Sequence, residues 1–250
     1  MKFAIRNLFR HKGRTGLTLA VIIFGVVGII LSGGFVEDIF IQLREATIHS
    51  RLGHIQVYHE GYTTVGLRNP YEYLLSDTDD LIGDELGSLP HVLDIMVRLN
   101  FSGLLNNGSA DLPIIGEGIE PDKESRMGSA VSIIAGRGLG AEDSYGMLVG
   151  KGVAQSLQLE PGDYVTLLAN TTDGSLNSLE FELVGVFRTF SRDFDNRAVR
   201  IPLGAAQELL DTRGVHSLVF SLDETVATDP VAGSLRQRLP ADEYEVKTWY

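Results

Sequence analysis

One long apolar run near the N-terminus divides the chain into a short basic segment and a long segment of mixed pattern. Residues 16–36 are 21 consecutive residues without a charge. At about 1.5 Å per residue, a helix of this length reaches about 31 Å, which matches a hydrocarbon core of about 30 Å. The pattern therefore predicts a transmembrane helix over residues 15–36.

The helical pattern continues beyond the apolar run. Phe35, Ile39 and Leu43 recur four residues apart beside charged neighbours, which is typical of an amphipathic helix. A cleaved signal peptide is the alternative, because Ser32 and the two glycines after it resemble a cleavage site. The run is longer than the roughly 7–15 apolar residues of a signal peptide, however. The sequence favours a retained anchor and a stalk helix over residues 37–52, either free or docked on the domain that follows.

The segment before the span combines cations with an apolar stripe. Lys2, Arg6 and Arg10 are spaced four residues apart, and the apolar residues between them form the opposite side. This pattern predicts a short helix over residues 1–14 that lies in the membrane interface with its cations toward anionic headgroups. The expected interface cations are Lys2, Arg6, Arg10, Lys12 and Arg14.

Three small residues of the span fall on one side of the helix. Gly25, Gly28 and Ser32 follow one another at spacings of three and four residues. Small residues allow a second transmembrane helix to approach closely. Glycine is also frequent in transmembrane helices in general. A packing face and ordinary membrane composition both account for these three residues.

The charges are distributed unequally about the span. The first 15 residues contain five Lys and Arg and no acid, whereas the rest of the chain holds 16 basic and 33 acidic residues, a net charge of −17. Because cations near a transmembrane end stay in the cytoplasm, the acidic bulk is expected on the outer side. Such a charge would also repel phosphate, which argues against a nucleic-acid partner. Cysteine is absent, so no disulfide stabilises the outer domain.

The outer segment alternates between strand-like and helix-like patterns and predicts an α+β domain, with one part inserted into another. An Asn-Gly step at Asn107 and Gly108 predicts a type I′ hairpin turn, and Pro202 is expected at the first position of a helix. The predicted strands are residues 53–59, 92–101, 112–118, 147–149, 164–168, 179–190, 197–201, 216–222 and 244–249. The predicted helices are residues 77–89, 153–157, 202–210 and 225–239.

Two glycine-rich segments suggest nucleotide binding, but their spacing does not support it. In residues 146–152 only three residues separate the glycines, and Lys151 is followed by glycine rather than by Ser or Thr. A phosphate loop needs four residues there and a hydroxyl for magnesium. Residues 136–140 lack the strand and helix that flank a dinucleotide-binding loop. The first segment is therefore interpreted as a strand turning into a short helix, and the second as a loop.

Other candidates for chemistry are no stronger. His54 and His59 are five residues apart on an expected strand, so their imidazoles face opposite sides. Asp193, Asp195 and Asn196 lack the twelve-residue loop and closing glutamate of a calcium site, and we interpret them as solvated loop charges. No serine lies in a nucleophile elbow. The sequence therefore predicts a protein that is not an enzyme, with no catalytic, cofactor-binding or metal-binding residue.

Four motifs in register resemble the permease subunits of the MacB/FtsX/LolC-like (type VII) ABC transporters. The start AIRNLFRHKGRT at residues 4–15 is similar to the family's opening motif A-x-R-N-L-x-R-x-K-x-R-T. The other three are VGKGVA with LEPGD at residues 149–163, FELVGVF at residues 181–187, and VRIPL with AQEL at residues 199–209.

The resemblance implies a two-part outer domain, named Porter and Sabre in this family. Residues 53–119 and 215–250 are expected to form the Porter-like sub-domain, built from ferredoxin-type βαβ units, and residues 120–214 the inserted, β-rich Sabre-like sub-domain. It also implies a protein of the inner (plasma) membrane with a cytoplasmic N-terminus and a periplasmic or extracellular main domain. The implied partners are the membrane, a separate cytoplasmic ATPase subunit that binds ATP, a second permease subunit (identical or different), and a periplasmic protein or lipoprotein. The implied function is mechanotransmission, for export or for release of lipoproteins and other envelope substrates.

Two features depart from the family pattern. The family has three more helices after this domain, and no further apolar span follows here, so we expect a fragment or a truncated gene product. The loop at residues 170–178 lacks the proline of the hook with which lipoprotein-releasing members recruit their carrier. A stand-alone membrane-anchored binding or sensor domain is the alternative, and it explains the single span but not the four motifs.

Overall fold

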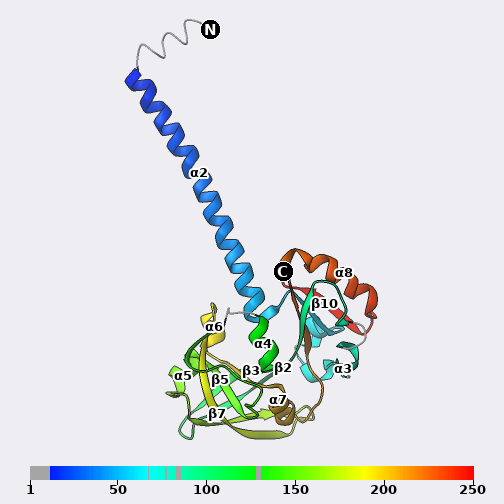
Figure 1. The fold of residues 1–250 in the computed structure, drawn as a ribbon. Helices are drawn as coiled ribbons and strands as arrows, with labels where there is room; N and C mark the ends of the chain where they lie inside the picture. Colours follow the sequence, from blue (N-terminus) through cyan, green and yellow to red (C-terminus); the bar gives the residue numbers. More distant parts are fainter. Residues whose placement is uncertain (1–11, 67, 77, 83–85, 128–130) are drawn as a thin grey trace. The chain divides into compact units, whose positions relative to one another are not determined.

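The computed structural model describes residues 12–66, 68–76, 78–82, 86–127 and 131–250. The chain divides into two compact units, Met1–Glu45 and Ala46–Tyr250. The first unit contains most of helix α2 (Lys12–Thr47), whose 36 residues form one continuous α-helix with no buried residue (Figure 1). At about 1.5 Å per residue this helix is about 54 Å long, so the predicted span and most of the predicted stalk are one element.

The stalk ends in a wider helical turn. The turn η1 (Ile48–Leu52) follows α2, and the backbone N–H of Gly53 donates to the Ile48 carbonyl at 2.8 Å. Gly53 has a φ of 62°, and a Cβ there would lie 2.4 Å from Cγ1 of Val219. Only glycine therefore fits where the chain turns from the helical segment into the first strand.

The second unit is built on one ten-stranded mixed sheet, with the strand order β10-β1-β9-β2-β3-β8-β5-β7-β4 and with β6 paired to both β2 and β7 (Figure 1). The strands are β1 (Ile55–His59), β2 (Val92–Asn106), β3 (Asp111–Ile119), β4 (Ser132–Gly136), β5 (Gly146–Gly150), β6 (Tyr164–Asn170), β7 (Leu176–Arg188), β8 (Ala198–Pro202), β9 (Ser217–Leu222) and β10 (Tyr244–Thr248). The helical elements are η2 (Tyr62–Gly66), η3 (Pro70–Tyr73), α3 (Thr78–Leu81), α4 (Pro121–Met127), α5 (Lys151–Leu157), α6 (Arg192–Asp195), α7 (Leu203–Leu210), η5 (Thr225–Ala227) and α8 (Thr228–Arg238).

Strand β2 is shared by the two halves of this sheet. Its first part, residues 92–98, pairs antiparallel with β9, whereas its second part, residues 99–106, pairs with β3 and then also with β6. From β2 the pairing runs through β3, β8, β5, β7 and β6 and returns to β2, so this half closes into a barrel. The expected division into sub-domains, with boundaries after residues 119 and 214, remains a prediction, because β2 joins the two halves into one sheet.

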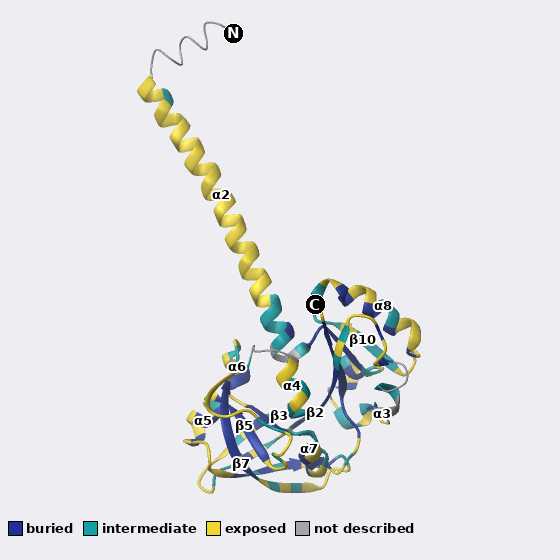
Figure 2. Cartoon of the chain, viewed as in Figure 1, coloured by how far each residue is buried: buried dark blue, intermediate teal, exposed yellow. Residues whose placement is uncertain are grey.

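Each half has its own apolar core (Figure 2). The half that stays open, with the strand order β10-β1-β9-β2, buries Ile55 and Phe220 beneath α8. Leu235 of α8 belongs to the same cluster. The barrel is filled by a larger cluster that includes Phe181 and Leu183, both fully buried. Burial of these side chains is the main driving force for the fold of the outer unit.

The structure confirms most predicted strands and helices and corrects three details. The helix predicted over residues 77–89 is not one regular α-helix: α3 covers Thr78–Leu81. Of the described residues after it, Ile82 and Leu86 have the wider helical form, and the Gly87 N–H donates to the Ile82 carbonyl at 2.9 Å. The hairpin after β2 is not a two-residue type I′ turn: residues 107–110 form its loop, and of these Gly108 alone has a positive φ. Helix α4 and strand β4 were not predicted, because residues 121–136 carry no apolar periodicity that would indicate them.

Candidate functional site

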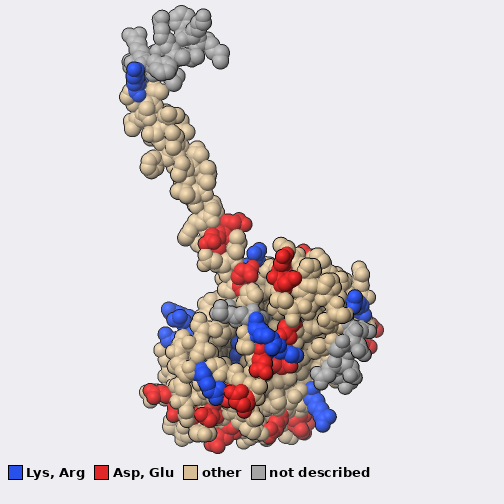
Figure 3. Space-filling model, viewed as in Figure 1, with Lys and Arg blue, Asp and Glu red and all other residues tan. Residues whose placement is uncertain are grey.

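The surface of α2 is apolar and exposed along the predicted span. Phe24 is 82% exposed and Ile29 is 75% exposed, and Figure 2 shows the same exposure along the helix. Of the described helices, α2 is the one that is long and apolar enough to cross a membrane. In Figure 3 most of this surface is free of charged atoms on the face in view. In water such a surface would be costly, so its natural surroundings are lipid or other apolar helices.

The predicted interface and packing residues are only partly covered by the structure. Lys12 and Arg14 lie in the first turn of α2 and are exposed. Lys2, Arg6 and Arg10 lie outside the described residues. Among the described residues, no atom would lie within 4 Å of a Cβ at Gly25 or Gly28, and Ser32 is exposed as well. The face for a second helix is therefore open, and its use stays a prediction.

The apolar side of the stalk is also open. Phe35, Ile39 and Leu43 are 66%, 46% and 50% exposed. Beside them, the amide of Gln42 donates to the Asp38 carboxylate one turn earlier at 2.6 Å, a contact that supports an isolated helix. The choice between a free and a docked stalk stays a prediction.

In the outer unit, the most unusual feature is a cluster of four buried charges on the outer face of the barrel. Arg98 of β2 contacts Glu124 of α4 at 2.7 Å, and the side chains are 4% and 8% exposed. Arg200 of β8 contacts Glu117 of β3 at 3.0 Å, and these side chains are 4% and 6% exposed. The cluster therefore joins three neighbouring strands to one helix.

The electrostatics of the cluster are balanced. Burial by itself would lower the pKa of Arg98, but the nearby carboxylates of Glu124 and Glu117 outweigh it and raise this pKa above its usual value. Arg200 also lies over the ring of Phe187, 5.6 Å from its centroid, which is a favourable cation–π distance. Two guanidinium groups and two carboxylates cancel, so this interior region carries no net charge. Such a cluster fixes geometry rather than performing chemistry.

An open hollow of about 410 Å³ lies beside this cluster. Its apolar lining includes Ile119, Ile133, Leu139 and Leu148, and its polar lining includes Glu124 and Arg200. The volume falls in the range of small-ligand sites, which is about 300–1,000 Å³. Glu124 and Arg200, the two buried charges that line the hollow, are already paired with Arg98 and Glu117. Their charges therefore indicate no particular ligand for the hollow.

The residues considered for chemistry have the following places in the fold. Gly146–Gly150 forms β5, and Lys151 begins α5, as the interpretation of this segment predicted. A Cβ at Gly152 would lie 2.1 Å from Oδ1 of Asn196, so this glycine allows close packing. His54 is buried, and its Nδ1 accepts from the N–H of Leu222 at 3.1 Å. His59 is partly exposed, and its Nδ1 lies 3.0 Å from the Glu60 carbonyl oxygen.

The interpretation of Asp195 as a solvated loop charge was wrong. Asp195 is only 5% exposed. Its carboxylate accepts from the backbone N–H of Thr189 at 3.0 Å and from the Thr189 hydroxyl at 2.8 Å. This carboxylate therefore closes the turn between β7 and α6, while Asp193 is exposed.

Sequence reasoning missed the buried charge cluster. A signal was present, because Arg98, Glu117 and Arg200 each stand among apolar residues of a predicted strand. A charge in such a position is expensive unless it is paired, so three of them in three strands indicate that the strands are neighbours. Glu124 carried no such signal, since its helix was not predicted.

The comparisons with known proteins agree with this architecture. The family model for the MacB-like periplasmic core domain matches residues 15–238. The periplasmic region of MacB from Actinobacillus actinomycetemcomitans has a TM-score of 0.55 at 14% identity, over 79% of this chain and 90% of that one. The extracellular domain of the noncanonic ABC-type transporter YknZ from Gram-positive bacteria has a TM-score of 0.54 at 13% identity, over 78% and 100%. At these identities both likenesses show the fold.

A curated relative matches a shorter part. The chain is 28% identical over 86 residues to the lipoprotein-releasing system transmembrane protein LolE of Haemophilus influenzae, which is 34% of this chain and 21% of that protein. The chain thus spans about a fifth of the length of this relative. The resemblance deduced from the four motifs is confirmed by the family match and by both structures.

Proposed function

This chain belongs to the MacB-like periplasmic core domain family, and on that premise we propose that it is a permease subunit of an ABC transporter, or the N-terminal part of one. In this role it couples ATP hydrolysis by a partner subunit to movement of its outer domain. The observation that carries the proposal is that the family match, residues 15–238, takes in the exposed apolar helix together with most of the outer unit.

The proposed orientation places the N-terminus in the cytoplasm and the residues after α2 in the periplasm or outside the cell. It is supported by the five cations of the first 15 residues, against a net charge of −17 beyond them. Cations near the end of a span remain on the cytoplasmic side. A cytoplasmic N-terminus would also lie on the side where ATP is hydrolysed.

The proposed partners are a cytoplasmic ATPase and a second permease subunit. The need for a separate ATPase is supported by residues 146–152, which form a strand and the start of a short helix rather than a phosphate loop. The need for a second subunit is supported by the open face of α2 at Gly25 and Gly28, where a Cβ would contact no atom of the described residues. Lipoproteins or other envelope substrates are the proposed cargo, by analogy with the LolE relative.

The mechanical role depends on the continuity of α2. Because one α-helix runs from Lys12 to Thr47, a tilt at one end of α2 moves its other end as well. Proline inside a helix removes a hydrogen bond and kinks the backbone, at a cost of about 3 kcal/mol or more. We propose that a kink between the span and the outer unit would uncouple ATP hydrolysis from work on the substrate.

The test is Ile41→Pro in the assembled permease with its ATPase. Ile41 is 41% exposed in α2, and Ile41→Ala is the matched control, because alanine preserves the helix. We expect the proline variant to be expressed and to hydrolyse ATP but to fail in a complementation assay, while the alanine variant complements. Normal complementation by the proline variant would contradict the mechanical role.

A further inference from the structure

The first part of β2 has one open edge. Residues 92–98 pair with β9 on one side, but pairing with β3 on the other side begins only at Leu99. Backbone groups on such an edge need partners other than a strand. Here the carbonyl of Ile95 and the N–H of Val97 are satisfied by side chains from the segment of α4.

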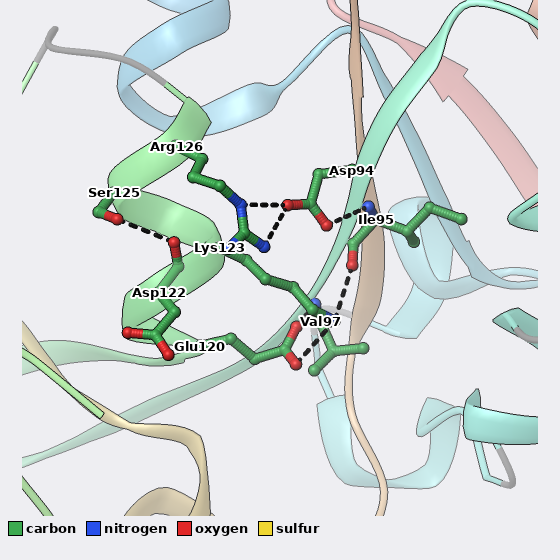
Figure 4. Close-up of polar contacts among 8 residues, drawn as sticks. All are labelled: Asp94, Ile95, Val97, Glu120, Asp122, Lys123, Ser125 and Arg126. Atoms are coloured by element: carbon green, nitrogen blue, oxygen red, sulfur yellow. Dashed lines mark hydrogen bonds and ion pairs between the residues drawn. The ribbon is translucent and has the colours of Figure 1, made fainter. Parts of the chain in front are cut away.

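These side chains act in place of a missing strand (Figure 4). The Lys123 ammonium donates to the Ile95 carbonyl at 3.1 Å, and the Glu120 carboxylate accepts from the Val97 N–H at 3.0 Å. Lys123 and Glu120 also pair with each other at 2.8 Å. One ion pair thus covers both backbone groups.

Two further ion pairs hold α4, one exposed and one buried. At the exposed end, Arg126 donates to Asp94 at 2.6 Å, and these side chains are 60% and 19% exposed. At the buried end, Glu124 contacts Arg98 inside the charge cluster. Salt screens exposed pairs strongly and buried pairs weakly, so the contacts of α4 differ in their sensitivity to ionic strength.

Among the side chains described for α4, apolar packing contributes little to the position of the helix. Apart from Pro121, the side chains described for α4 are polar or charged, namely Asp122, Lys123, Glu124, Ser125 and Arg126. Pro121, Glu124 and Ser125 also line the hollow of about 410 Å³. The helix therefore covers the β2 edge and borders the hollow, and charge is its main attachment.

We propose that α4 is a charge-held strap. It opens when the exposed ion pair between Arg126 and Asp94 is screened or broken, and it turns about the buried contact between Glu124 and Arg98. Opening exposes the edge of β2 at Ile95 and Val97 and widens the hollow. This device is a property of the outer unit, and it stands whether or not the chain is a transporter subunit.

The test is hydrogen–deuterium exchange of the full chain in detergent micelles, resolved to single amides. Between about 0.1 and 1 M KCl the Debye length falls from about 10 to 3 Å. The Val97 amide is expected to exchange about two- to fivefold faster at high salt, which is the range for losing one exposed ion pair, that of Arg126 with Asp94. The amides of β9, on the other side of β2, report global unfolding and should not change.

Charge reversal identifies the contact. Arg126→Asp and Asp94→Arg should each speed exchange at Val97 at low salt, and the double variant should return the rate to within about twofold of the native chain, because it restores one pair. Arg213→Asp, at an exposed position outside the strap, is the matched control and should have no effect. The proposal is overturned if salt leaves Val97 unchanged, if β9 accelerates equally, or if the double variant exchanges as fast as the single ones.

Discussion

Replacing Glu124 by glutamine removes one charge from a buried group of four. The side chains of Arg98 and Glu124 are 4% and 8% exposed and lie 2.7 Å apart, so the guanidinium cannot turn to water when its partner is lost. With two positive and two negative groups the native cluster is neutral, and the variant leaves one positive charge in excess.

The magnitude follows from this burial. Breaking a buried pair by removing one partner costs about 3–5 kcal/mol, whereas an exposed pair is worth about 0–1 kcal/mol. Glutamine still offers an oxygen to Arg98, and Glu117 remains nearby. We therefore expect Glu124→Gln to lower the free energy of unfolding of the outer unit by about 3 kcal/mol, at the lower end of that range.

The assay is urea unfolding of the full chain in detergent micelles, followed by the fluorescence of Trp249, the single tryptophan of the chain. Asp122→Asn makes the same change of charge at an exposed position of α4, and it should change the free energy by no more than about 0.5 kcal/mol. The double variant Arg98→Met with Glu124→Met should recover most of the loss, because no unpaired charge then remains. Equal, small effects of Glu124→Gln and Asp122→Asn would refute the reasoning.

Two further predictions concern the core. Burial lowers the pKa of His216 from 6.5 to about 4, against a smaller raising effect of the Pro70 backbone, so the unfolded chain binds this proton more readily than the folded one. The contribution of His216 to stability is therefore complete above about pH 6.5 and falls by about 3 kcal/mol toward pH 4. Urea unfolding between pH 4 and 6.5 should show that the free energy of unfolding depends less steeply on pH in His216→Phe than in the native chain. An equally steep dependence in both would count against this prediction. A Cβ at Gly116 would lie 2.0 Å from the buried ring of Phe101, so Gly116→Ala should cost about 1–3 kcal/mol. Gly204→Ala is the control, because no atom of the described residues would lie within 4 Å of its Cβ in α7; it should cost nothing in the same thermal or urea unfolding assay.

The parts of the fold that follow from local rules were predictable from the sequence. The helix over residues 16–36 is fixed by composition alone, and the chain reverses at Asn107 and Gly108 because glycine there takes a φ of 87°. The exact loop was not predictable, because side-chain oxygens of Asn106 and Asn107 accept from Gly108 and Ala110 and stabilise a longer turn.

The parts that depend on distant contacts were not predictable. The sequence of helix α4 has no apolar stripe, although Pro121 and the acids of its first turn are typical of a helix start. Ion pairs to residues 26 and 32 positions earlier in the chain hold it in place. Asp195 looked like an ordinary loop acid until its contact with Thr189 placed it in the interior. The ion pairs of α4 and the hydrogen bonds of Asp195 show that polar contacts can replace apolar burial as the reason for an element's position.

The orientation of the chain in the membrane is the most direct test of the account. Because cysteine is absent, Lys12→Cys and Asp173→Cys each provide a single thiol, at the start of α2 and in the exposed loop between β6 and β7. A membrane-impermeant maleimide applied to spheroplasts should label Asp173→Cys at once and Lys12→Cys only after permeabilisation. Labelling of Lys12→Cys with protection of Asp173→Cys in intact spheroplasts would contradict a cytoplasmic N-terminus and an outer domain beyond the membrane.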